Sequence, residues 1–183
     1  MQLVELLLAH GATPDGYLPG PGITSEIYAP WEDMAPMPPH QWHSPLRSVC
    51  SLSGHSSRAE LLVTLLLDSG ADVNRRASQI LTSPLHTLCL AAYQSTGNDP
   101  GFTKAAFYAQ KLSIARLLLD NGADIFQPNY QGHAPIDRAD GEVLVLFQKH
   151  LIITIRKHVG AVPADLAPLI ASFLLAPPPP PPA

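Results

Sequence analysis

Two cysteines, Cys50 and Cys89, are the residues of this 183-residue chain best suited to covalent chemistry. A thiol becomes an activated nucleophile when a histidine lies beside it as a base and a third group orients that histidine. His55 and His86 stand near the two cysteines in the sequence, but no orienting acid follows at a recognisable spacing. Each cysteine falls six residues after a serine that could begin a helix, and a free thiol behaves as a small apolar side chain that is usually buried. We therefore predict that both thiols pack in the interior and that the chain has no catalytic residue, with a thiol enzyme as the least favoured function.

A metal site is the second chemical possibility. His40 and His43 are three residues apart and Cys50 follows them, so these side chains could be zinc ligands. A structural zinc site needs four ligands in tetrahedral geometry, and a proline-rich segment is a poor frame for it. The chain also has no glycine loop of the kind that cradles phosphate and no paired carboxylates. The sequence therefore predicts neither a metal nor a cofactor.

Three copies of one apolar pattern dominate the chain and must position any functional residue. They read LVELLLAHGA (3–12), LVTLLLDSGA (62–71) and IARLLLDNGA (114–123). A single column is polar in all three, and apolar residues three and four positions apart surround it. This spacing predicts helices that are buried on most of their surface. A glycine follows each helix (Gly11, Gly70 and Gly122), and glycine ends helices readily because it adopts the left-handed backbone without strain.

A second recurring pattern, Ser-Pro-Leu, precedes two of these helices at residues 44–46 and 83–85, with a weaker version, Ala-Pro-Ile, at 134–136. Serine caps a helix by accepting a hydrogen bond from a free backbone N–H, and proline fits the next position because its missing N–H needs no partner there. Each unit should therefore contain a capped short helix, a turn, a longer helix and a glycine stop. From Thr103 onward the third long helix can extend to about five turns.

The segments SPLHTLCLAAY (83–93), LLLDSGADVN (65–74) and GHAPIDRA (132–139) resemble the helices of ankyrin repeats. The resemblance implies an all-α ankyrin-repeat solenoid of about three and a half irregular helix-turn-helix repeats. A standard repeat spans roughly 33 residues, whereas the three glycines are 59 and 52 residues apart, so the chain carries long insertions. The predicted array covers residues 1–159, with a half repeat at 1–12, a proline-rich insertion at 13–43, and repeats at 44–76, 83–126 and 134–159.

A stack of helical pairs presents a continuous open surface, because each pair buries its apolar face only against its neighbours. In the family that this chain resembles, partner proteins are held by the hairpin tips and the inner helices. The expected function is therefore a non-catalytic protein-binding scaffold. Carried over to this sequence, the resemblance implies that the protein-binding residues are Arg47, Arg75, Arg76, Gln79, Gln127, Asn129, Tyr130 and Gln131.

Three further residues have expected structural roles. His86 resembles the structural histidine of the family, which bonds near its own helix cap, and the resemblance implies that role here. Trp31 and Trp42 lie in the proline-rich insertion. Large aromatic side chains in such a segment either fold back on the helices or anchor a partner, and we favour the first interpretation because exposed aromatics are unfavourable.

The C-terminal residues leave two interpretations open. Residues 162–174, VPADLAPLIASFL, resemble the first helix of an F-box, and the tail is similar to the SOCS box of ubiquitin-ligase adaptors. The alternative function is therefore a substrate adaptor that binds a ligase scaffold through residues 151–175. We favour a helix over residues 160–176 that caps the last repeat, since a terminal repeat needs its apolar side covered. Residues 177–183 are expected to form a polyproline tail.

Composition and charge narrow the choice of partners. Apolar residues make up 46% of the chain, charged residues make up 14%, and the net charge is -4 without any block of like charges. This balance disfavours nucleic acids and anionic membranes and leaves another protein as the expected partner. No apolar run approaches the roughly 18 residues of a membrane helix, and the N-terminal residues lack the pattern of a secretory signal. We expect a cytoplasmic or nuclear protein that is not secreted.

Overall fold

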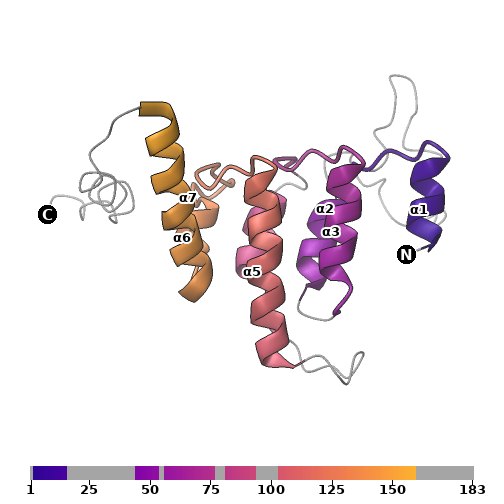
Figure 1. The fold of residues 1–183 in the computed structure, drawn as a ribbon, viewed down its shortest axis with the longest axis horizontal. Coiled ribbons are helices and arrows are strands. Elements are labelled where there is room, and N and C mark those ends of the chain that lie inside the picture. Colours follow the sequence, from indigo (N-terminus) through magenta and orange to yellow (C-terminus); the bar gives the residue numbers. More distant parts are fainter. Residues whose placement is uncertain (1, 16–43, 54–55, 77–80, 94–102, 160–183) are drawn as a thin grey trace, which may run out of the picture. The chain divides into compact units, whose positions relative to one another are not determined.

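The computed structural model describes residues 2–15, 44–53, 56–76, 81–93 and 103–159 (Figure 1). These residues form helices and connecting turns, and they contain no β-strand. The chain divides into two compact units, Met1–Asp140 and Gly141–Ala183. The expected all-α class is therefore confirmed for the described residues. The helices are α1 (Gln2–Ala9), α2 (Pro45–Leu52), α3 (Ala59–Asp68), α4 (Pro84–Leu90), α5 (Lys104–Asp120), α6 (Pro135–Arg138) and α7 (Gly141–Val159).

The three repeated helices α1, α3 and α5 end in the same hydrogen-bonded turn. Gly11, Gly70 and Gly122 have φ angles of 86°, 88° and 86°, in the left-handed region that glycine adopts without a Cβ penalty. In each copy the glycine N–H donates to the carbonyl three residues earlier, and the next N–H donates to the carbonyl five residues earlier, at 2.9–3.0 Å. These are the two bonds of a Schellman motif. The predicted glycine stops are confirmed.

Two helix starts have the predicted serine caps, and Thr103 caps α5 in the same way. The side-chain oxygens of Ser44, Ser83 and Thr103 each accept a hydrogen bond from the backbone N–H three residues later, at 3.2, 3.4 and 3.2 Å. Ala134 has no side-chain acceptor, and the Asp137 carboxylate instead accepts the Ala134 N–H at 2.7 Å. With its start fixed by Thr103, α5 runs for 17 residues, which matches the expected length of about five turns.

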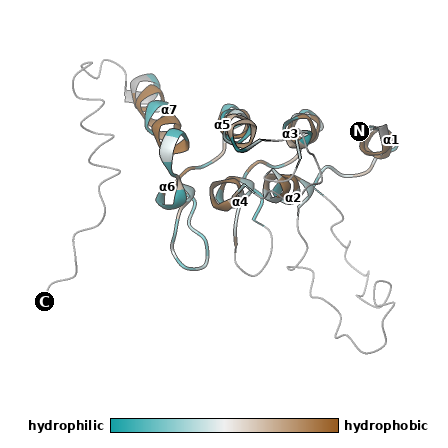
Figure 2. Cartoon of the chain, turned by 90° about the horizontal axis from the view of Figure 1, so that it is seen from below, coloured by the Kyte–Doolittle hydropathy of each residue, from teal (hydrophilic) through white to brown (hydrophobic). Residues whose placement is uncertain are grey.

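Within Met1–Asp140 the helices lie in two layers. α3 and α5 stand side by side in one layer, and α2, α4 and α6 follow one another in the second (Figures 1 and 2). α2 packs against α3, and α4 packs against α5. Apolar side chains from both layers fill the space between them and expose no surface: Leu46, Val63, Leu88, Ile114 and Leu118.

Both cysteines belong to this interior. Cys50 on α2 and Cys89 on α4 are buried, and both are free thiols. Each cysteine lies near the C-terminal end of its short helix. The two helices, α2 and α4, belong to the same layer and pack directly on one another. The prediction that the cysteines are small packing residues in the interior is confirmed.

The second unit is described by its helix α7, which is 19 residues long. Val143, Phe147 and Leu151 are buried, and their spacing of four residues places them on one face of the helix. Among the described helices, none combines the length and the apolar character that are needed to cross a bilayer.

Several predictions concern residues outside the described part of the chain, and they stay predictions. The ligase-adaptor function is among them, because most of the segment on which it depends, residues 151–175, lies outside the described residues. The residues concerned are the zinc candidates His40 and His43, the base candidate His55, the aromatic residues Trp31 and Trp42, the binding residue Gln79, and residues 160–176 and 177–183.

Candidate protein-binding surface

Most of the predicted binding residues fall in two of the three connecting segments that follow the glycine stops. The three segments, residues 12–15, 71–76 and 123–134, form the hairpin edge. The second and third segments fold in the same way at their start. Asp72 and Asp124 each accept a hydrogen bond from the backbone N–H two residues later, at 2.9 and 2.8 Å. Such turns fix the backbone locally, so the hairpin edge has a defined course.

Hydrogen bonds of one type also join consecutive segments of the hairpin edge. Asp15 Oδ1 accepts the N–H of Asp72 at 2.9 Å, and Asn74 Oδ1 accepts the N–H of Asp124 at 2.8 Å. Asp15 and Asn74 both lie four residues after a glycine stop, so the two bonds are equivalent rungs of a ladder. Asn74 adds a second bond, from its Nδ2 to the carbonyl of Gly122 at 2.9 Å. The ladder fixes the spacing of the three segments.

The third segment ends this ladder. Its equivalent position is occupied by Phe126, whose ring cannot accept an N–H bond and is 44% exposed. In the same segment Tyr130 is 57% exposed, and its hydroxyl accepts a hydrogen bond from Gln131 Nε2 at 2.9 Å. Two aromatic rings therefore face solvent on a segment whose backbone is held by its own turns. Rings of this kind bury a large area when a partner covers them.

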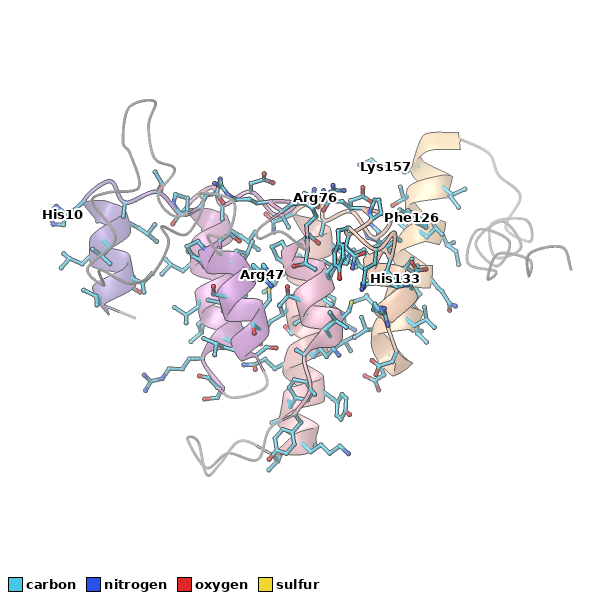
Figure 3. All side chains as sticks on the ribbon, turned by 180° about the vertical axis from the view of Figure 1, so that it is seen from behind. His10, Arg47, Arg76, Phe126, His133 and Lys157 are labelled. Atoms are coloured by element: carbon cyan, nitrogen blue, oxygen red, sulfur yellow. The ribbon has the colours of Figure 1, made fainter. Side chains whose placement is uncertain are left out.

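The two neighbouring arginines of the second segment have different surroundings. Arg75 is half-buried, and its Nη1 lies 3.5 Å from Asp15 Oδ2, so it reinforces the ladder. Arg76 is exposed, and within the described residues it makes no ion pair or hydrogen bond. Figure 3 shows Arg76 and Phe126 along the same edge of this unit. Of this pair, only Arg76 has a guanidinium fully available to a partner.

The predicted amide residues of the third segment mainly support the fold. Asn129 Oδ1 accepts the backbone N–H groups of Gln131 and His133, at 2.9 and 3.0 Å, and so shapes the tip. Gln127 reaches back to the carbonyl of Asn74 with its Nε2, at 3.4 Å. Its Oε1 is buried and has no hydrogen-bond partner among the described residues. The side chain of Gln131 is exposed.

Arg47 and His86 perform the same structural task in successive units. Both lie three residues after a capping serine, and both donate to the residue that precedes the next helix cap. Arg47 Nε donates to Thr82 Oγ1 at 3.0 Å, and His86 Nε2 donates to the carbonyl of His133 at 2.9 Å. Arg47, which is half-buried, is therefore engaged within the chain by at least one of its donors.

The geometry around His86 defines its protonation. Its Nδ1 accepts the backbone N–H of Ser83 at 3.2 Å, while its Nε2 faces the carbonyl of His133. One nitrogen must accept and the other must donate, which is the arrangement of a neutral imidazole with its proton on Nε2. Burial lowers the pKa of His86 below its ordinary value and favours that neutral form. The prediction that His86 bonds at its own helix cap is confirmed.

The buried thiols are poor candidates for nucleophiles. Burial raises the pKa of Cys50 to about 12 and that of Cys89 to about 12. Because the thiolate is the reactive form, both residues are held in the unreactive state near neutral pH. Elsewhere in the described part of the chain, no group of three or more His, Cys, Asp and Glu side chains is placed to hold a metal ion.

One buried charge stabilises the end of α4. Lys111 on α5 is buried, and its Nζ donates to the carbonyls of Cys89 and Ala91 at 2.9 and 3.1 Å. Asp140 Oδ1 lies 3.8 Å from the same Nζ. A cation at the carboxyl end of a helix is favourable because free carbonyls gather there. Lys111 therefore replaces the glycine turn that ends the long helices.

Sequence reasoning missed one exposed apolar residue of the hairpin edge, Phe126. The sequence did indicate that this position differs, because the equivalent residues in the earlier copies are the polar Asp15 and Asn74. Leu81 directly precedes the cap region of α4, is 40% exposed and has a φ of 51°. A leucine in the left-handed region is uncommon, and nothing in the neighbouring sequence indicates it.

Neither a protein-family model nor a curated protein matches this chain. The interpretation of its function therefore depends on the geometry of its own residues and on the resemblance of its repeated segments.

Proposed function

We propose that this chain is a non-catalytic protein-binding module, built as an ankyrin-type solenoid of about three and a half irregular repeats, whose hairpin edge holds another protein. The observation that carries the proposal is the contrast along this edge. Its backbone is fixed by turns and by the ladder, whereas the side chains of Arg76, Phe126 and Tyr130 are exposed to solvent.

The repeated local geometry supports the solenoid part of the proposal. Three helices end in identical glycine turns, two short helices begin with the same Ser-Pro cap, and two side chains link one unit to the next in the same way. Repetition of this kind is expected when each unit is stable only against its neighbours. An array of such units offers an extended surface for a partner.

The residue types at the edge support protein binding. Tyrosine and arginine are enriched among the residues that dominate binding energy, and aromatic rings bring a large contact area with few rotatable bonds to order. Phe126 is informative because Asp15 and Asn74, at the equivalent positions, hold the next segment. A ring at this position gives up that hydrogen bond and places apolar surface in water. A partner that covers Phe126 would remove this apolar surface from water, which would stabilise the complex.

The surroundings of the cysteines favour binding over catalysis. Thiols that titrate near pH 12 supply almost no thiolate at neutral pH. His86, the histidine nearest in sequence to Cys89, has both ring nitrogens engaged in structural hydrogen bonds. A thiol-enzyme mechanism would need the opposite arrangement.

The proposal is tested with a triple variant, Arg76→Ala, Phe126→Ala and Tyr130→Ala, in the full chain. Proteins near the wild-type chain in cells are identified by proximity labelling, and binding of each is then measured with purified components. We expect the triple variant to keep its melting temperature within about 2 °C, because the three side chains are exposed. We expect its affinity for the true partner to fall at least about tenfold.

A matched control removes the same kinds of side chain from the outer faces of α3 and α5. It should keep full binding, since these positions lie outside the hairpin edge. Equal binding by the wild-type chain and the hairpin-edge triple variant would reject the proposal. The control changes are Leu61→Ala, Tyr108→Ala and Arg116→Ala, all at exposed positions.

A further inference from the structure

The solvent-facing side of α7 has an unusual composition. Among residues 141–155 and 157, whose side chains the structure describes, the exposed positions apart from Gly141 and Glu142 in the first turn are Val145, Lys149, Ile153 and Lys157. These four residues are spaced by four, so they form one row along the helix. Val145 is 47% exposed and Ile153 is 63% exposed. The row therefore alternates aliphatic and basic side chains; its end at Lys157 is labelled in Figure 3.

Exposed aliphatic side chains distinguish this row from an ordinary solvated face. On the opposite side Val143, Phe147 and Leu151 are buried, and Figure 2 shows brown apolar bands between teal polar ones along α7. A surface helix normally has one apolar stripe and one polar face, and on α7 the aliphatic residues Val145 and Ile153 lie outside the buried stripe. Val145 and Ile153 are the large apolar residues that are exposed among the described side chains of α7.

The charge of the row indicates which partner would cover it. Neither Lys149 nor Lys157 makes an ion pair within the described residues. Across the helix, three basic residues stand against the single acidic residue Glu142, although the whole chain has a net charge of -4. A complementary surface would carry carboxylates beside the lysines and aliphatic side chains over Val145 and Ile153.

We infer that the row Val145, Lys149, Ile153 and Lys157 is a docking face for an acidic amphipathic helix of a partner protein. The row spans about 18 Å at the helical rise of 1.5 Å per residue, a length that a second helix can follow at a shallow crossing angle. Leucines of that helix would cover the two aliphatic residues, and flanking glutamates would pair with the lysines, as charges flank the apolar seam between paired helices.

An anionic membrane is the less suitable occupant. Helices that lie in a membrane surface separate a wide apolar face from a basic face. Here the apolar and basic residues alternate along the same row, so insertion of Val145 and Ile153 would draw both lysines towards the acyl chains. A helix with carboxylates at matching intervals avoids this conflict.

The test uses the full chain and a fluorescein-labelled synthetic helix with leucines at every third and fourth position and glutamates beside them. Fluorescence anisotropy should show saturable binding that weakens in high salt. We expect the double variant Lys149→Glu, Lys157→Glu to weaken binding at least about fivefold, and Ile153→Asp to weaken it similarly. A control peptide with lysine in place of glutamate should not bind.

A matched charge control separates the row from the overall charge of the protein. The double variant Arg58→Glu, Arg116→Glu reverses two exposed cations in the first unit and gives the same net charge as the α7 double variant. It should bind the acidic peptide within about twofold of wild type, since screening limits the influence of distant charges. Equal weakening by both double variants would overturn the inference.

Two further outcomes would also overturn it. Vesicles containing phosphatidylserine could bind the chain more tightly than the acidic peptide does, which would assign the face to a membrane. The residues after Val159 could instead cover the row in the full chain. The variant Ile153→Cys tests this possibility, because Cys50 and Cys89 are buried and a new exposed thiol would be the site that reacts. We expect it to be labelled about as fast as a free thiol, and slow labelling would refute the exposed face.

Discussion

The glycine stops allow the most direct estimate of a stability change. Gly70 has a φ of 88°, and a Cβ added there would meet no atom within 4 Å. The substitution Gly70→Val therefore adds backbone strain without a clash against neighbouring atoms. An L-residue in the left-handed conformation costs about 1–2 kcal/mol, and a β-branched residue is among the least tolerant of it.

Relaxation of the backbone would not avoid this loss. If residue 70 rotated to a right-handed conformation, it would break the bonds from its own N–H to the Leu67 carbonyl and from the Ala71 N–H to the Leu66 carbonyl, which measure 2.9 and 3.0 Å. Two such bonds contribute about 1–3 kcal/mol together. Strain and relaxation thus give similar costs, and we expect the free energy of unfolding to fall by about 1–3 kcal/mol.

Urea denaturation followed by far-ultraviolet circular dichroism measures this change. In thermal denaturation, a fall of 1 kcal/mol in the free energy of unfolding would lower the melting temperature by about 2–4 °C in a chain of this size. Gly70→Asn is the matched control, because asparagine tolerates the left-handed region better than valine. We expect it to lose less than about half as much. An unchanged midpoint for Gly70→Val, or an equal loss for both variants, would refute the assignment of Gly70 as a strained helix stop.

Three further results are expected. Burial lowers the folded-state pKa of His86, so the stability that His86 provides is present above its unfolded pKa of about 6.5 and is lost as the pH falls through the lowered folded pKa. The midpoint of urea denaturation should therefore decline below pH 6.5, and His86→Gln should reduce that decline. Asn74→Ala removes the acceptor of the Asp124 N–H and should cost about 0.5–1.5 kcal/mol in urea denaturation, whereas Asn74→Asp keeps the acceptor and should cost less. Iodoacetamide at neutral pH should alkylate Cys50 and Cys89 at least about 100-fold more slowly in the folded chain than in urea, and fast modification would contradict their burial.

Local signals in the sequence predicted the ends of the helices well. Glycine at a stop and serine before proline at a start act through bonds within a few residues, so their outcome depends little on the rest of the fold. Gly122 and Ser83 therefore show the geometry that the sequence indicates. The cysteine packing was predictable for a related reason, because Cys50 and Cys89 repeat one position in two copies of the same short helix.

Contacts between distant segments were harder to predict. Arg47 was expected on the binding face, but its Nε donates to Thr82, 35 residues away. The sequence offered a clue, since Arg47 and His86 lie at the same distance from their caps, yet the shared acceptor position became visible only in the structure. Asn74 likewise bonds to Asp124, 50 residues further on. Long insertions hide such pairings, because the spacing of the repeats no longer indicates which residues meet.

The binding role of the hairpin edge is the central claim, and site-specific photo-crosslinking in cells tests it most directly. A photoreactive phenylalanine analogue is placed at Phe126 or Tyr130 in the full chain, and at Tyr108 on the outer face of α5 as the control. We expect the same protein to be captured from Phe126 and Tyr130 and not from Tyr108. Capture of that protein from Tyr108 alone, or of unrelated proteins from the two edge positions, would contradict the claim.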